Sequence, residues 1–168
     1  MGAMKTLHIV GFKNSGKTTL ITRWIRLAKM QGLTVAVLKH HGHPSPLEMP
    51  DSMTDSMQYL TSGADVSAVS GGGAVQFHMN EELDFRRMKE IATIGKPDIL
   101  LIEGYKEELG EKVVLSRSQS DWTELKNLPN IQLVVEQNDT KTDFQPVLAR
   151  SDKEQLDSWF LNWIVEGV

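Results

Sequence analysis

The clearest chemical signal in the sequence is the segment Gly11–Thr18, which satisfies the pattern G-x-x-x-x-G-K-[ST] at every fixed position. Such a loop wraps its backbone N–H groups around phosphate oxygens, and its curvature requires residues without a Cβ at Gly11 and Gly16. Lys17 can place its charge between the β- and γ-phosphates, and the Thr18 hydroxyl can bind magnesium. We therefore expect this phosphate-binding loop (P-loop) to bind a nucleoside triphosphate with Mg²⁺.

The elements around the P-loop are those that such a loop requires. Leu7–Val10 predicts a short buried strand, Lys17–Gln31 carries apolar residues at helical spacing, and Thr34–Leu38 predicts a second strand. This βαβ order implies a parallel sheet, with the phosphates at the N-terminus of the helix, where the helix dipole favours anions. The expected phosphate-binding residues are Gly11, Lys13, Asn14, Ser15, Gly16, Lys17, Thr18 and Thr19.

A carboxylate near the magnesium is the second part of such a site. The most continuous apolar run, Asp98–Ile102, predicts a central strand that ends at Glu103, with Asp98 at the opposite end. Because ligands of open α/β sheets bind at the carboxyl ends of the strands, Glu103 is the better candidate. We expect Glu103 to be catalytic together with Lys17, either holding magnesium-bound water or orienting the attacking water. The alternative is a salt bridge at the strand end.

The rest of the chain continues the alternation of strands and helices. The expected elements are a helix from the capping box at Ser52–Asp55 to Ser62, a hairpin of Val66–Ser70 and Ala74–His78, a helix at Glu81–Ile94, strands at Lys112–Leu115 and Ile131–Val135, and a helix at Asp152–Ile164. The fold class expected is therefore α/β, a P-loop NTPase three-layer fold with a mostly parallel central sheet flanked by helices. The 168 residues suit one domain, with Met1–Ala3 read as a tag remnant before the native start at Met4.

Composition narrows the class of protein. The net charge of −4 argues against general nucleic-acid binding. The absence of cysteine excludes disulfides and thiolate metal sites, and is compatible with a reducing cytoplasm. No apolar run approaches the ~20 residues that a membrane-spanning helix needs.

Two further groups could reach the site. Lys39–His43 follows the second strand, so Lys39 and His40 could meet the γ-phosphate or another anionic ligand; a metal site at His40, His41 and His43 and a solvated polar loop are the alternatives. Asp55 is a second candidate for magnesium, unless it only caps its helix.

A candidate for base recognition lies later in the chain. Thr140–Asp143 matches the T-K-x-D pattern of many GTPases, in which the aspartate accepts hydrogen bonds from N1–H and N2–H₂ of guanine. Asp143 is therefore a candidate guanine contact, and a polar turn before Pro146 is the alternative.

Taken in order, these motifs resemble the MobB family, the molybdopterin-guanine dinucleotide biosynthesis protein B. The resemblance covers nearly the whole chain and rests on Gly11–Leu20, Lys39–His43, Thr54–Ser56, Ser62–Ala64 and Asp98–Lys106. It implies a homodimeric GTP-binding protein with weak GTPase activity, and the location that we expect, from the lack of cysteine, is cytoplasmic. It also implies a partner, the molybdopterin guanylyltransferase, a role in molybdenum cofactor maturation, and molybdopterin as a candidate ligand.

Three functions remain open from the residues. A slow GTPase is favoured because fast P-loop hydrolysis needs an arginine finger or an ordered glutamine, and Arg117 is only the nearest candidate. A small-molecule kinase would need an arginine-bearing lid, whereas Arg86 and Arg87 fall on an expected helix. A metal-delivery NTPase would use the histidine cluster.

Overall fold

The computed structural model describes residues 3–42, 45–137 and 142–166. They fall into two compact units, one combining Met1–Gly42 with Met88–Val168 and the other formed by His43–Arg87.

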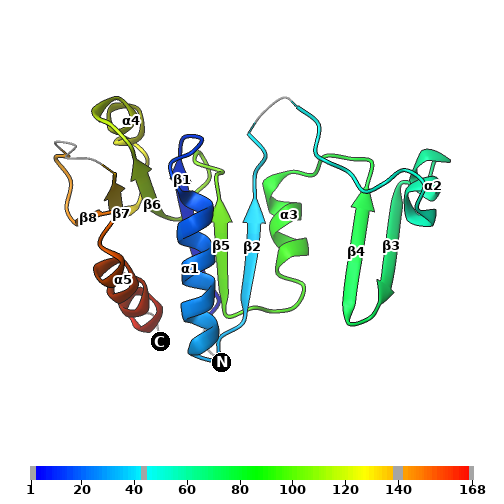
Figure 1. Cartoon of the computed structure of the whole chain (residues 1–168), viewed down its shortest axis with the longest axis horizontal. Coiled ribbons are helices and arrows are strands. Elements are labelled where there is room, and N and C mark those ends of the chain that lie inside the picture. Colours follow the sequence, from blue (N-terminus) through cyan, green and yellow to red (C-terminus); the bar gives the residue numbers. More distant parts are fainter. Residues whose placement is uncertain (1–2, 43–44, 138–141, 167–168) are drawn as a thin grey trace. The chain divides into compact units, whose positions relative to one another are not determined.

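The first unit is built on a six-stranded sheet with the strand order β2-β5-β1-β6-β7-β8 (Figure 1). All five neighbouring pairs are parallel. The strands are β1 (Lys5–Gly11), β2 (Val35–Lys39), β5 (Ile99–Glu103), β6 (Glu111–Ser116), β7 (Ile131–Glu136) and β8 (Val147–Ala149). Every residue of β5 is buried, as its unbroken apolar sequence predicts, and β5 lies in the interior between β2 and β1.

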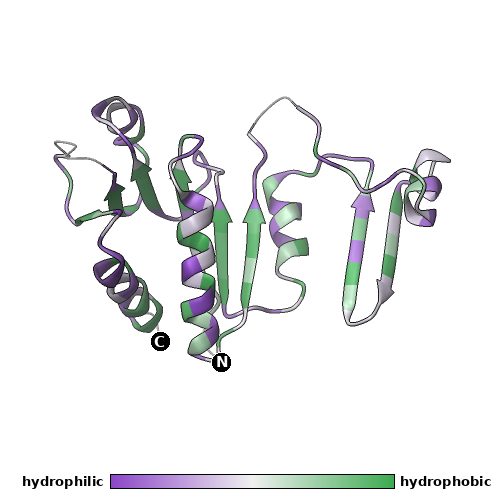
Figure 2. Cartoon of the chain, in the orientation of Figure 1, coloured by the Kyte–Doolittle hydropathy of each residue, from purple (hydrophilic) through white to green (hydrophobic). Residues whose placement is uncertain are grey.

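Helices cover the sheet, and each face has its own apolar core. Helices α1 (Lys17–Met30) and α5 (Lys153–Val165) pack on one core, where Leu7 and Ile9 of β1 point. Helix α4 (Gln119–Leu125) packs on the other through Trp122 and Leu125, against Val10 and the neighbouring strands. Figure 2 shows the strands of this sheet as predominantly hydrophobic, whereas α1 alternates between hydrophobic and hydrophilic residues. The expected α/β fold with a mostly parallel central sheet and flanking helices is confirmed.

Aromatic stacking joins α1 to α5 over the first core. The Trp24 ring is fully buried and lies parallel to Phe160 at 4.6 Å between centroids, with Trp159 at 5.8 Å. Phe160 in turn stacks on Trp163. Because these rings bury large areas in fixed geometry, they hold α1, and with it the P-loop, against the sheet.

The second unit contains a hairpin and a short helix. Strands β3 (Val66–Gly71) and β4 (Ala74–Met79) pair antiparallel, as expected, and α2 spans Asp55–Thr61. The capping box expected to start at Ser52 is wrong: Thr54 precedes the helix without a side-chain cap bond, and its hydroxyl donates to the Asp51 carbonyl instead. Helix α3 (Phe85–Ala92) crosses the boundary between the units and is shorter than the expected Glu81–Ile94.

The sequence reading missed two elements, α4 and β8. Strand β8 has only three residues, too few for an apolar period to show.

None of the described helices is both long and apolar enough to cross a membrane.

The sheet also buries two ionisable side chains. His8 of β1 and Lys112 of β6 are partners in the parallel register and are almost completely buried. The Lys112 ammonium donates to the Glu108 and Gly110 carbonyls at 2.7 and 3.2 Å. Burial, and then the positive charge of Lys112, lower the pKa of His8 from 6.5 to about 4.

This shift predicts a pH-dependent stability. His8 binds a proton near pH 6.5 in the unfolded chain but only near pH 4 in the folded chain. The contribution of neutral His8 to the free energy of unfolding is therefore fully present above pH 6.5 and is lost as the pH falls from 6.5 to 4. We expect His8→Gln to remove part of this acid sensitivity, up to about 3 kcal/mol between pH 7 and pH 4. Urea unfolding at several pH values checks it, with His41→Gln as the exposed control; equal pH slopes in both variants would contradict it.

Candidate functional site

The P-loop leaves β1 and turns directly into α1. Gly16 has a φ of +93°, and Gly11 approaches β6 so closely that a Cβ on it would lie 2.7 Å from the Leu115 carbonyl oxygen. Both positions therefore require glycine, for the reason that the sequence pattern predicts. Ser15 is buried, and its hydroxyl has no hydrogen-bond partner within the described part of the chain. The exposed members of the expected binding set are Lys13, Asn14, Thr18 and Thr19.

The Lys17 ammonium lies over the P-loop itself. It donates to the Gly11 and Phe12 carbonyls at 3.0 and 2.8 Å. Partial burial lowers the pKa of Lys17, the Glu103 carboxylate acts in the opposite direction, and Lys39 lowers it further. The charge is thus held inside the turn where phosphate oxygens are expected.

Glu103 lies beside the start of α1, as expected from its place at the end of β5. The Thr18 hydroxyl donates to its Oε2 atom at 3.3 Å, and Lys39 Nζ lies 3.7 Å from its Oε1 atom. Oxygen ligands next to each other on an octahedral magnesium ion are about 3 Å apart, so the Thr18 and Glu103 oxygens fit a shared ion. The salt bridge considered as the alternative is also present, with Lys39.

Asp98 lies at the opposite end of β5, as the direction of the strand requires. Its carboxylate accepts bonds from the Thr34 amide and hydroxyl at 2.7 and 2.6 Å. These bonds hold the pKa of Asp98 below its usual value. The choice of Glu103 over Asp98 for the phosphate edge agrees with this geometry.

The Lys39–His43 segment begins at the same edge. The His40 amide donates to the Glu103 carbonyl at 3.0 Å, and the His40 ring packs on Tyr105 with 4.7 Å between centroids. His43 lies outside the described residues, and the described ones contain no group of three potential ligands that could hold a metal ion. Lys39 and His40 are therefore brought to the Glu103 end of the site, and their ligand stays a prediction.

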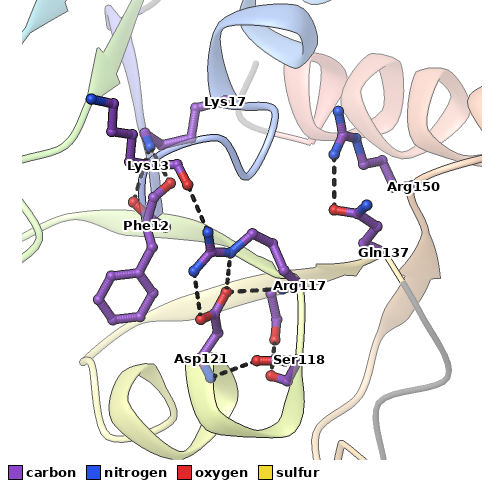
Figure 3. A network of polar contacts seen from close by, with 10 residues as sticks. Phe12, Lys13, Lys17, Arg117, Ser118, Asp121, Gln137 and Arg150 are labelled. Carbon is purple, nitrogen blue, oxygen red and sulfur yellow. Dashed lines mark hydrogen bonds and ion pairs between the residues drawn. The ribbon is translucent and has the colours of Figure 1, made fainter.

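Arg117, which follows β6, packs against the P-loop. Its Nη1 atom donates to the Lys13 carbonyl at 2.8 Å, and its Nε and Nη2 atoms hold both oxygens of Asp121 at 2.7 and 2.9 Å (Figure 3). Asp121 is fixed by α4, because its backbone amide donates to the Ser118 hydroxyl that caps the helix. The sequence singled out Arg117 as a guess, and Asp121 could have been found from its i, i+4 spacing to it.

Arg150 was missed entirely. It follows β8, and its guanidinium lies where a Gly16 side chain would be: a Cβ on Gly16 would be 2.6 Å from Arg150 Cζ. Its Nη1 atom donates to Gln137 Oε1 at 3.2 Å, as Figure 3 shows. The signal in the sequence is weak, because a three-residue strand brings this side chain to the loop.

Asp143 and Asp55 are the remaining candidate site residues. Asp143 is exposed and accepts a bond from the buried Trp122 indole at 2.8 Å, which lowers the pKa of Asp143. Thr140 and Lys141 of the T-K-x-D pattern lie outside the described residues. Asp55 is the first residue of α2 in the second unit. Guanine contact by Asp143 and magnesium binding by Asp55 stay predictions.

A P-loop followed by a helix, with a carboxylate on the neighbouring parallel strand, places the chain among α/β proteins with a P-loop NTPase-like fold. The family model described as MobB, "Molybdopterin guanine dinucleotide synthesis protein B", matches residues 6–137. The chain therefore belongs to the MobB family.

Individual relatives agree with this assignment. A Bacillus subtilis protein named "Probable molybdopterin-guanine dinucleotide biosynthesis adapter protein" is 35% identical over 153 residues, which cover 90% of this chain and 88% of that one. A MobB homologue from Bacillus stearothermophilus has a crystal structure with a TM-score of 0.79 at 31% identity, covering 97% of this chain and 99% of its own. The Bacillus subtilis MobB structure gives a TM-score of 0.79 at 32% identity, covering 94% and 97%.

The Arg117 contacts predict a role in ordering the P-loop. Arg117→Gln removes the bond to the Lys13 carbonyl and the two bonds from the guanidinium to Asp121, whose Oδ2 atom keeps only the bond from the amide of residue 117. We expect faster amide hydrogen exchange at residues 12–16 and a loss of about 1–3 kcal/mol in unfolding free energy. Arg26→Gln, on the exposed side of α1, is the matched control. Unchanged exchange in the P-loop of Arg117→Gln would show that this contact does not order it.

Proposed function

We propose that the chain is a GTP-binding accessory protein with slow GTPase activity that supports the biosynthesis of molybdopterin guanine dinucleotide. The observation that carries the proposal is the 3.3 Å approach of the Thr18 hydroxyl to the Glu103 carboxylate beside the Lys17 ammonium. This arrangement offers a hydroxyl and a carboxylate to a magnesium ion and a fixed positive charge to the phosphates it binds.

Each residue has a definite part in this proposal. The P-loop amides and the N-terminus of α1 bind phosphate oxygens, and Lys17 leaves the Gly11 and Phe12 carbonyls to meet the β- and γ-phosphates. Thr18 and Glu103 hold magnesium, which neutralises charge on the phosphates when bound. Lys39, 3.7 Å from Glu103, adds positive charge at the γ-phosphate end.

The arginines beside the P-loop support the proposal of slow hydrolysis. Phosphoryl transfer on a P-loop is accelerated by a cation that stabilises charge developing on the γ-phosphate. Arg117 lies nearby, but it is bound to both oxygens of Asp121 and to the Lys13 carbonyl, so its charge is already compensated. Arg150 follows β8, across β1 from the strands that end at Glu103 and Lys39, so it lies on the side away from the expected γ-phosphate. A partner nucleotidyltransferase that binds this edge is the proposed source of acceleration.

Guanine preference rests on the family and on Asp143. The relatives' names connect them to molybdopterin-guanine dinucleotide, and the exposed Asp143 carboxylate is held by Trp122 with lone pairs still available for a base. A homodimer and molybdopterin as a ligand belong to the same proposal.

Nucleotide titration tests the binding half of the proposal. Wild-type protein is titrated with GTP, ATP, GDP and ADP, with and without Mg²⁺. We expect GTP to bind more tightly than ATP, Mg²⁺ to increase GTP affinity, and Lys17→Ala to weaken GTP at least about tenfold, because a charge-assisted phosphate contact is lost. Equal affinity for ATP and GTP would contradict the guanine assignment, and multiple turnovers per second by the isolated chain would contradict slow hydrolysis.

A second variant, Glu103→Gln, tests the proposal that Glu103 binds magnesium. Glu103→Gln removes the negative charge beside Thr18 while keeping the shape of the side chain. We expect GTP binding without Mg²⁺ to be preserved or strengthened, and the gain in affinity on adding Mg²⁺ to be lost. Glu107→Gln, an exposed carboxylate just beyond the end of β5, is the matched control. If Mg²⁺ still raises the GTP affinity of Glu103→Gln as much as that of the control, Glu103 does not bind the ion.

A further inference from the structure

The guanidinium of Arg150 lies flat against the P-loop. A Cβ on Gly16 would be 2.6 Å from its Cζ atom, 2.7 Å from Nη2 and 2.8 Å from Nε. Because Cζ is nearer to this Cβ position than the two nitrogens are, the Cβ position lies over the face of the guanidinium plane and not at its edge. Gly16 thus makes room for a planar cation as well as for a left-handed backbone turn.

The end of β7 holds this side chain in place. The Arg150 amide donates to the Glu136 carbonyl at 2.7 Å, and its Nη1 atom donates to Gln137 Oε1 at 3.2 Å. Gln137 is neutral, and within the described residues no carboxylate forms an ion pair with Arg150. This contrasts with Arg117, whose charge is paired with Asp121. Among the described residues, the Arg150 guanidinium is therefore a cation without a paired carboxylate, held beside the P-loop by Gln137.

The strand order shows which part of a nucleotide this cation would meet. Glu103 and Lys39 end β5 and β2, on one side of β1, and they mark the magnesium and γ-phosphate end. Arg150 follows β8 on the other side of β1, beyond β6 and β7. We expect a nucleotide whose γ-phosphate lies towards β5 to extend its nucleoside in the opposite direction, towards β7 and β8.

We propose that Arg150 binds the nucleoside end of the nucleotide. Its guanidinium, which packs on Gly16 and donates to Gln137, would contact the purine and the ribose. The proposal rests on the proposed function, since it requires a nucleotide in the P-loop. A planar guanidinium can stack on a base, whereas a lysine ammonium cannot reproduce that contact. Arg150 would then determine nucleotide affinity independently of the phosphate groups that Lys17 binds.

The test separates the nucleoside from the phosphates. Wild-type protein, Arg150→Ala, Arg150→Lys and the exposed control Arg26→Ala are titrated with GTP, GDP and tripolyphosphate, after circular dichroism and thermal unfolding confirm that each variant is folded. Arg150→Ala and Arg150→Lys should both weaken GTP and GDP by the same factor, about tenfold from base–side chain stacking, and leave tripolyphosphate unchanged. Lys17→Ala, in contrast, should weaken tripolyphosphate together with GTP.

Three other results would overturn the proposal for Arg150, and a fourth would overturn the proposed function. Unchanged GTP affinity in Arg150→Ala overturns the proposal, as does full affinity in Arg150→Lys, because a stacking plane is then not needed. An equal loss for tripolyphosphate and GTP overturns it as well, since Arg150 would then bind phosphate. If the wild-type chain binds neither GTP nor tripolyphosphate, the proposed function itself fails, and this outcome differs from all the others.

Discussion

The site depends on one constraint, the parallel register of β1 with its two neighbours. Ile9 lies opposite Glu103 of β5, and Gly11 lies opposite Leu115 of β6, so the three strands end at one edge of the sheet. The chain that leaves β1 must turn there, and the turn places the start of α1 against the carboxylate of β5. A shift of the β1–β5 register by one residue would move Glu103 to the other face and break its approach to Thr18.

Sequence reasoning predicted the parts of the site that the chain order and strand direction determine. The P-loop pattern with its βαβ context gave the positions of Lys17 and Thr18, and the direction of β5 distinguished Glu103 from Asp98. Arg150 could not be found in this way, because it reaches Gly16 through β8, a three-residue strand more than one hundred residues later in the chain. No local period or motif reports such a contact, which exists only once the sheet is assembled.

Helix capping shows why a local motif is sometimes insufficient. Ser52–Asp55 has the spacing of a capping box, but the helix begins at Asp55 and the Thr54 hydroxyl donates to Asp51 instead. Ser118–Asp121 has related chemistry, and there the Ser118 hydroxyl does accept from the Asp121 amide and starts α4. Packing does not separate the two cases, because α2 buries Met57 and Leu60 as α4 buries Trp122 and Leu125. What α4 has in addition is a fixed first turn, since Arg117 holds the Asp121 carboxylate while the Asp121 amide donates to Ser118.

The distribution of charge explains how an acidic chain can present an anion site. The net charge is −4, yet the basic side chains of Lys17, Lys39, Arg117 and Arg150 come from four separate places in the sequence to the same edge of the sheet. The nearby carboxylates of Glu103 and Asp121 are each already engaged by a cation or a hydroxyl. These four cations outnumber the two carboxylates, so the charge gathered beside the P-loop is positive although the net charge of the chain is negative. Under the proposed function, this excess of positive charge attracts the polyphosphate. The net charge alone argues against nucleic acid as a general partner, but it says nothing about this local gathering of cations, which exists only in the folded chain.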